Sequence, residues 1–253
     1  MLVPLITGVL AGLLAGGNAL PIAPLSIAVL ALFWLRTPVE SWIGAAPVKA
    51  RTPGEFRLVR RAALVLAAVS GTASVWLFWG GRNLAILWIG AAAGVALLAQ
   101  AMVKRGGRDG REAAQMIGAA GLTAVAPAAW YVVTGHFHGA VWWLWVANFL
   151  FAANQIQFVQ LRIRAAHVTT RSGKIFAGRW FLAAQAFLLV LLASGRLLPW
   201  YAALAFLPVL FRGFAWFVLP SKTLAIHALG KRELVYAGLF GVLLAGGFAL
   251  RAV

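Results

Sequence analysis

Long apolar runs, separated by short blocks of charged residues, follow one another along the whole chain. Most approach the roughly 17 to 25 residues that cross about 30 Å of hydrocarbon as an α-helix. The pattern predicts an all-α, polytopic transmembrane helical bundle that forms a single domain over residues 1–253. Nine spans are predicted, at approximately 2–15, 21–35, 62–79, 84–103, 113–134, 141–161, 180–193, 198–218 and 234–250.

The composition agrees with a membrane protein. Hydrophobic residues make up 63% of the 253 residues, and the mean hydropathy is +0.90. Because apolar runs recur along the whole length, we expect no separate soluble core. The chain contains no cysteine, which excludes disulfides and thiolate metal sites.

The net charge of +17 is of the size found in nucleic-acid-binding proteins, but its distribution argues against such a partner. The basic residues lie in short blocks between apolar runs, as expected of cytoplasmic loops under the positive-inside rule. With the N-terminus inside and the C-terminus outside, only Arg82, Arg196 and Arg251 of the 22 basic residues face outward. We therefore predict a multi-pass protein of the bacterial cytoplasmic membrane, surrounded by membrane lipids and without a nucleic-acid partner.

The acidic residues fall on the same predicted inward side as the basic blocks. The inward connections are long and the outward ones short, so a functional site is expected to face the cytoplasm. One interpretation is that the charges are solvated loop residues and local ion pairs; the other is that they line a cytoplasm-facing basin. The acids are Glu40, Glu55, Asp109, Glu112 and Glu233.

The stretch ANQIQFVQLRIR, residues 153–164, closes the sixth predicted span with four side-chain amides, two arginines and no carboxylate. On a helix, steps of three and four residues place four of these side chains near one stripe: Asn154, Gln157, Gln160 and Arg164. Amides inside hydrocarbon cost free energy unless they find partners, so this stripe is expected to face the bundle interior. The amides either bridge neighbouring helices or line a polar pocket.

In a pocket, the amides would bind neutral oxygens while arginines pair with phosphate oxygens. Magnesium prefers several oxygen ligands that typically include carboxylates, so the amide-rich stretch argues against metal chemistry, and we predict no metal and no cofactor. The ligand of such a pocket would be a prenyl or lipid phosphate. The predicted ligand-binding residues are Asn154, Gln157, Gln160, Arg162, Arg164, Arg36 and Glu40.

Nine spans, an inward N-terminus and long loops after spans two and six resemble the UbiA-like membrane prenyltransferases. The resemblance implies aspartate-rich motifs at the ends of those two spans, which would hold magnesium against a prenyl diphosphate. The corresponding stretches are LFWLRTPVESWI and NQIQFVQLRIRAAH, which contain one glutamate, Glu40, and no aspartate. Magnesium would be needed only if the chain were a divergent member of that class.

The chain more closely resembles the YwiC-like family of small bacterial membrane proteins. The resemblance lies in LRTPVESW at 35–42, FVQLRIR at 158–164 and KTLAIHALGKRELVYAGLFGVLL at 222–244. That family typically opens with a polar histidine-glycine-alanine-tryptophan stretch before its first span. Because this chain starts at MLVPLITGVL, the resemblance implies that a segment with a candidate functional histidine is missing.

Three functions follow as hypotheses. The favoured one is a membrane protein of UbiA-like arrangement that binds an amphipathic anion in an inward pocket. The second is a divergent prenyltransferase whose metal ligands are Glu40, Glu55, Asp109 and Glu112. The third is a small-molecule transporter, suggested by the similar loop order of spans one to four and five to eight.

Overall fold

A computed structural model describes residues 1–43, 52–80, 85–105, 110–137, 139–195, 198–219 and 225–252. Throughout these ranges the regular structure is α-helical and no strand occurs, which confirms the predicted all-α class. The chain forms two compact units, Val3–Val141 and Trp142–Val253. The division falls between the fifth and sixth predicted spans. A single domain over the whole chain remains a prediction.

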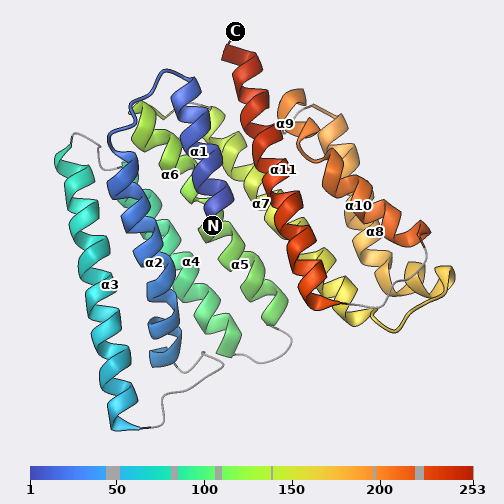
Figure 1. The fold of residues 1–253 in the computed structure, drawn as a ribbon, viewed down its shortest axis with the longest axis horizontal. Helices are drawn as coiled ribbons and strands as arrows, with labels where there is room; N and C mark the ends of the chain where they lie inside the picture. The colour runs from blue at the N-terminus through green and yellow to red at the C-terminus, as the bar shows by residue number, and fades with distance from the viewer. Residues whose placement is uncertain are drawn as a thin grey trace. The chain divides into compact units, whose positions relative to one another are not determined.

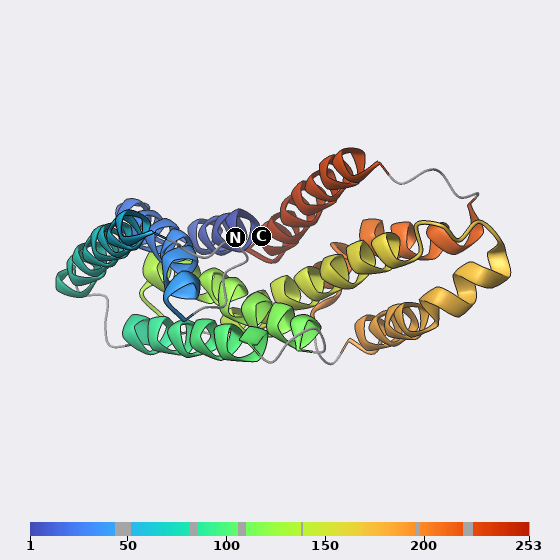
Figure 2. The same ribbon diagram turned by 90° about the horizontal axis from the view of Figure 1, so that it is seen from below.

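Among the described residues, the first unit contains six helices. Within it, α2 packs along α3, and α4 packs along α5 (Figures 1 and 2). The buried face of α1 joins α2 and α6 in one apolar cluster built around Leu5, Leu25 and Val132. The helices are α1 (Leu2–Leu14), α2 (Ile22–Ile43), α3 (Pro53–Trp79), α4 (Ala85–Arg105), α5 (Arg111–Thr123) and α6 (Val125–Thr134).

The second unit contains five helices in the part that the structure describes. Here α8 packs against α10, and α9 packs against α11 (Figure 1). Its apolar cluster includes Phe158, Leu161, Phe181 and Trp216, which come from α7, α8 and α10. The helices are α7 (Ala140–Arg164), α8 (Arg171–Ala193), α9 (Trp200–Leu204), α10 (Leu207–Val218) and α11 (Ile226–Ala252).

Within the described residues, six helical segments are long and apolar enough to cross a membrane. Each overlaps one of the nine predicted spans, and the other three predicted spans are occupied by α1, α7 and α11. The span count of nine and the orientation remain predictions. The six segments are Ile22–Trp42, Pro53–Trp79, Ala85–Lys104, Glu112–Thr134, Arg171–Ala193 and Trp200–Val218.

Two helices begin about two and a half turns earlier than the apolar pattern predicts, because capping residues precede the charged part of each. The Thr52 hydroxyl accepts a hydrogen bond from the Glu55 amide, and the Glu55 carboxylate accepts one from the Thr52 amide, which is a complete capping box. The Thr170 hydroxyl accepts from the Gly173 amide at the start of α8. These caps extend both helices through their basic residues.

Two predicted spans are each divided into a pair of helices. In 113–134 the break separates α5 from α6, and Pro127 follows it; in 198–218 the break separates α9 from α10, and Pro208 follows it. Proline has no amide hydrogen to donate to the carbonyl four residues earlier, so continuous helical pairing is lost at these points. Both segments still qualify in length and hydropathy as single crossings.

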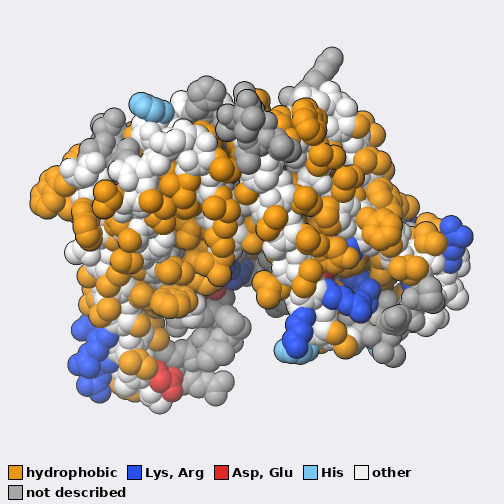
Figure 3. Space-filling model, turned by 45° about the horizontal axis from the view of Figure 1, so that its top comes forward, with side chains coloured by type: hydrophobic (Ala, Val, Ile, Leu, Met, Phe, Trp, Pro, Cys, Tyr) orange, Lys and Arg blue, Asp and Glu red, His pale blue; other side chains and the backbone are white. Residues whose placement is uncertain are grey.

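The flanks of the helices expose large apolar side chains, among them Trp76 and Trp88 in the first unit and Phe187 and Val242 in the second. Figure 3 shows hydrophobic side chains spread over much of the visible face, whereas basic side chains gather mainly in its lower half. Hydrocarbon accepts exposed apolar side chains that water does not. The surface is therefore that of a multi-helix membrane protein.

Candidate functional site

A cavity of about 650 Å³ lies within the second unit, between α7, α10 and α11. This size is within the range of small-molecule sites, roughly 300 to 1,000 Å³. Its charged lining consists of Arg162, Arg212, Arg232 and Glu233, and most of the remaining lining is apolar. The cavity therefore combines a positive region with a hydrophobic one.

Arg212 is the most deeply placed of the three arginines, with only 7% of its surface exposed. Its terminal nitrogens form an ion pair with the Glu233 carboxylate of α11 and donate to Asn154 Oδ1 of α7 at 2.9 Å. The guanidinium carbon lies 4.1 Å from the ring centroid of Phe158 and 5.1 Å from that of Tyr236. Three helices therefore converge on one buried cation, held by charge, hydrogen bonding and aromatic faces.

The ion pair between Arg212 and Glu233 does not use all of its hydrogen-bonding atoms. Among the described residues, neither Arg212 Nε nor Glu233 Oε1 has a hydrogen-bond partner, although both atoms are buried. Gln155 Nε2 donates to the backbone carbonyl of Glu233 at 3.1 Å and ties this part of α11 to α7. Buried polar atoms without partners are costly, so this arrangement favours a further ligand or water at the cavity.

The other two arginines are more accessible. Arg162 is half-buried and Arg232 is exposed, and neither forms a hydrogen bond or ion pair with any residue that the structure describes. Arg162 lies just beyond the predicted span 141–161. Burial lowers the pKa of its guanidinium, the charge of Arg232 lowers it further, and Glu233 opposes both effects. Two mutually repelling cations at one cavity, neither of them paired within the described part of the chain, favour the binding of an anion.

The apolar wall of the cavity is positioned by a buried lysine. Lys174 Nζ of α8 donates to the carbonyls of Trp216 at 3.1 Å and Leu219 at 2.6 Å. It thereby satisfies carbonyls at the C-terminal end of α10, where a positive charge is favourable. The ammonium also lies 5.4 Å from the centroid of the Trp216 ring, and Trp216 and Leu219 both line the cavity.

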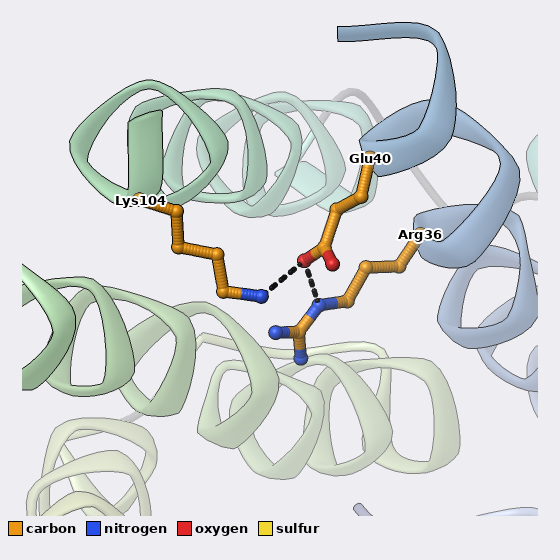
Figure 4. A network of polar contacts seen from close by, with 3 residues as sticks. All are labelled: Arg36, Glu40 and Lys104. Atoms are coloured by element: carbon orange, nitrogen blue, oxygen red, sulfur yellow. Dashed lines mark hydrogen bonds and ion pairs between the residues drawn. The ribbon is translucent and has the colours of Figure 1, made fainter. Parts of the chain in front are cut away.

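A second charged group lies in the first unit and ties α2 to α4 (Figure 4). Glu40 Oε1 accepts from Arg36 Nε at 2.7 Å and from Lys104 Nζ at 2.8 Å, and Glu40 is buried. The Arg36 pair spans one helical turn, while Lys104 comes from a helix 64 residues further along the chain. The predicted site residues Arg36 and Glu40 therefore lie in this unit and are engaged with each other.

The predicted residues of α7 do not share one environment. Asn154 is buried against Arg212, and Arg162 lines the cavity. Gln157 and Arg164 are exposed, and Arg164 Nη2 donates to Gln160 Oε1 at 2.6 Å. None of these last three residues lines the cavity.

Helical geometry explains this separation. The buried face of α7 passes through Asn154, Phe158, Leu161 and Ala165, which are spaced by four, three and four residues. At about 100° per residue, Gln157 lies roughly 60° to one side of Asn154 and the later members of the polar stripe lie further round. The expected inward direction of the stripe is therefore wrong for Gln157 and Arg164, which are both exposed.

Arg212 and Glu233 are absent from the predicted ligand-binding residues, because both fall on the predicted inward side with the other charges. The signal was present for Arg212, which lies inside the apolar run LPVLFRGFAWFV at 207–218. An arginine within an apolar span is costly in hydrocarbon and generally faces a partner in the protein interior. Glu233 gave no comparable signal, because it follows Lys231 and Arg232 at the edge of a run.

Two of the acids proposed as metal ligands have other roles. Glu40 pairs with two cations, and Glu55 completes the cap of α3. Asp109 lies outside the described residues. Among the residues that the structure describes, no three histidine or acidic side chains come together as a metal-binding group.

Comparison with known protein families gives a match. A family model described as YwiC-like protein matches residues 1–130. No curated protein and no solved structure matches the chain. The matched stretch contains the Arg36 and Glu40 pair of the first unit, while the cavity of the second unit lies beyond it.

Proposed function

The chain belongs to the YwiC-like protein family, and we propose that it is a multi-pass membrane protein that binds an amphipathic anion in the cavity of its second unit. The ligand class is a prenyl phosphate or a lipid phosphate. The observation that carries the proposal is the meeting of Arg162, Arg212 and Arg232 around a cavity whose other walls are largely apolar.

The charged part of the cavity suits a phosphate group. Guanidinium groups donate pairs of parallel hydrogen bonds to phosphate oxygens, and Arg162 and Arg232 have no competing partner among the described residues. Asn154 contributes indirectly, because its amide oxygen holds Arg212 in place. The proposed site thus retains Asn154 and Arg162 from the sequence-based set.

The apolar part of the cavity suits a hydrocarbon chain. Phe158, Trp216 and Leu229 line it, and all three belong to the apolar cluster of the second unit or pack against it. Burial of apolar ligand surface against such walls contributes about 25 cal/mol per Å². Under the predicted orientation, Arg162 and Arg232 lie on inward segments, so the cavity would open toward the cytoplasm.

Lipid co-purification tests the proposal. The protein is extracted from bacterial membranes in mild detergent, and its bound lipids are identified by mass spectrometry against the total membrane lipid. We expect a phosphate-bearing lipid to be enriched in the native chain. Replacing both accessible arginines, in Arg162→Gln with Arg232→Gln, is expected to reduce that enrichment about tenfold, which corresponds to about 1.4 kcal/mol.

Arg164→Gln provides the matched control, because Arg164 lies on the same helix end as Arg162 but is exposed and paired with Gln160 outside the cavity. The control should retain the native enrichment. An enriched phosphate lipid that persists unchanged in the double variant, or no enrichment in the native chain, would count against the proposal.

A further inference from the structure

We infer that Glu233 sets the charge of the cavity so that it selects a head group with two negative charges. This inference rests on the proposed function. The ligand class is then an amphipathic phosphomonoester, in preference to a singly charged phosphodiester and to a more highly charged diphosphate.

The charge of the cavity follows from its lining. Three arginines and one glutamate are the charged residues that line it within the described part of the chain, so the cavity carries a net charge of two positive units. The nearby Lys174 does not line the cavity, and its ammonium is committed to backbone carbonyls of α10. Without Glu233 the same cavity would carry three positive units.

Glu233 is held in place by its contacts, so its negative charge stays at the cavity. Its carboxylate pairs with Arg212, while Gln155 holds its backbone carbonyl. Its other carboxylate oxygen, Oε1, is buried and has no hydrogen-bond partner among the described residues. Arg212 is itself buried by Asn154 and Phe158, so neither member of the pair can turn to water without repacking α7 against α10.

Charge matching decides between head groups because the inner part of the cavity, at Arg212 and Glu233, is buried. Coulomb interactions are stronger at low effective dielectric, and an unbalanced charge loses its hydration without compensation. A phosphomonoester carries about −1.5 to −2 at pH 7, which balances the cavity. A phosphodiester leaves a positive charge unpaired, and a diphosphate places excess negative charge against the Glu233 carboxylate.

Binding of short-chain soluble probes to the purified protein in phosphatidylcholine nanodiscs tests this inference by calorimetry. The four probes are geranyl phosphate, geranyl diphosphate, dioctanoyl phosphatidic acid and dioctanoyl phosphatidylglycerol. We expect the native chain to bind each monoester about tenfold more tightly than the probe of the same tail and different charge. A stronger affinity for geranyl phosphate identifies a prenyl source, and a stronger affinity for phosphatidic acid identifies a glycerolipid source.

Substitutions that change the cavity charge should change the preference in a defined direction. Glu233→Gln is expected to shift the ratio of diphosphate to monophosphate affinity about tenfold toward the diphosphate. Arg232→Gln should shift the preference toward phosphatidylglycerol. Lys231→Gln is the matched control, since Lys231 is exposed, is adjacent to Arg232 and does not line the cavity.

The double variant Arg212→Gln with Glu233→Gln restores two positive units, and it should restore the monoester preference even where absolute affinities fall. Equal losses of affinity for all probes in Glu233→Gln would show that Glu233 only positions Arg212, and would overturn the inference while leaving the proposed function intact. Absence of binding of every probe to the native chain would overturn both. Because Arg232 is exposed, its variant tests the inference even if Glu233→Gln does not fold.

Discussion

Arg212 shows how a single buried charge is tolerated at the edge of an apolar core. The guanidinium meets one carboxylate, one amide oxygen and two aromatic faces, and these partners come from α7 and α11. Taking a cation out of water costs several kcal/mol unless such partners replace the lost hydration. The side chain therefore links the packing of three helices to the chemistry of the cavity.

Breaking this pair from one side is expected to be more harmful than removing it entirely. Arg212→Gln leaves the Glu233 carboxylate buried without its cation, which should cost about 3 to 5 kcal/mol. The double variant Arg212→Gln with Glu233→Gln should recover most of that loss. Thermal unfolding in one detergent at a fixed scan rate, followed by circular dichroism, measures the effect, and a double variant no more stable than the single one would contradict it.

At the level of the elements, close approach of α8 and α10 depends on glycines placed opposite large side chains. A Cβ at Gly178 would lie 2.7 Å from a ring carbon of Phe217, and one at Gly213 would lie 2.4 Å from the amide of Gln185. In the first unit, a Cβ at Gly118 of α5 would similarly lie 2.5 Å from the amide of Gln100. Small residues that let helices approach are typical of packing in membranes.

Gly178→Ala should therefore destabilise the protein by about 1 to 3 kcal/mol, because the rigid ring of Phe217 has to move. Gly238→Ala on α11 is the control, since a Cβ there meets nothing within 4 Å. The control should be neutral or gain up to about 1 kcal/mol from the better helix propensity of alanine. Apparent melting temperatures of both variants should move in these different directions, and equal shifts would show that the close approach is unimportant.

The ends of the helices illustrate why element boundaries were only partly predictable. Apolar runs indicate where a helix crosses hydrocarbon, but hydrogen bonds of Thr52 and Thr170 decide where α3 and α8 begin. Conversely, Pro127 and Pro208 lie inside predicted spans and coincide with breaks in them. Capping and proline effects are local and visible in the sequence, so these boundaries were accessible in principle.

At the scale of the whole molecule, the family match and the proposed binding cavity fall in different units. The family match covers residues 1–130, nearly all of the first unit, and confirms the predicted resemblance to YwiC-like proteins. The proposed binding cavity belongs to the second unit. The UbiA-like arrangement of spans stays a prediction. The location in the bacterial cytoplasmic membrane and the orientation of the chain across it also stay predictions.

Reporter fusions test the predicted topology. Fusions at Gly81, Gly107, Gly139 and Gly173 should lie outside, inside, outside and inside, because the basic blocks remain on the cytoplasmic face. A periplasm-active enzyme and a cytoplasm-active fluorescent reporter at each position provide opposite readouts. Any other alternation would mean that the span count of nine is wrong. Gly81 and Gly107 lie outside the described residues.

The sequence by itself determined the class of the protein and the positions of its helices, because hydropathy over about 20 residues reports directly on the preference for hydrocarbon. It also identified Asn154 and Arg162 as polar residues of interest. Only the tertiary structure brought Arg212 to Glu233 and to Asn154, across 21 and 58 residues of chain. Such pairings depend on which faces of α7, α10 and α11 pack together, and the periodicity of one helix does not specify the side chains that another helix presents to it.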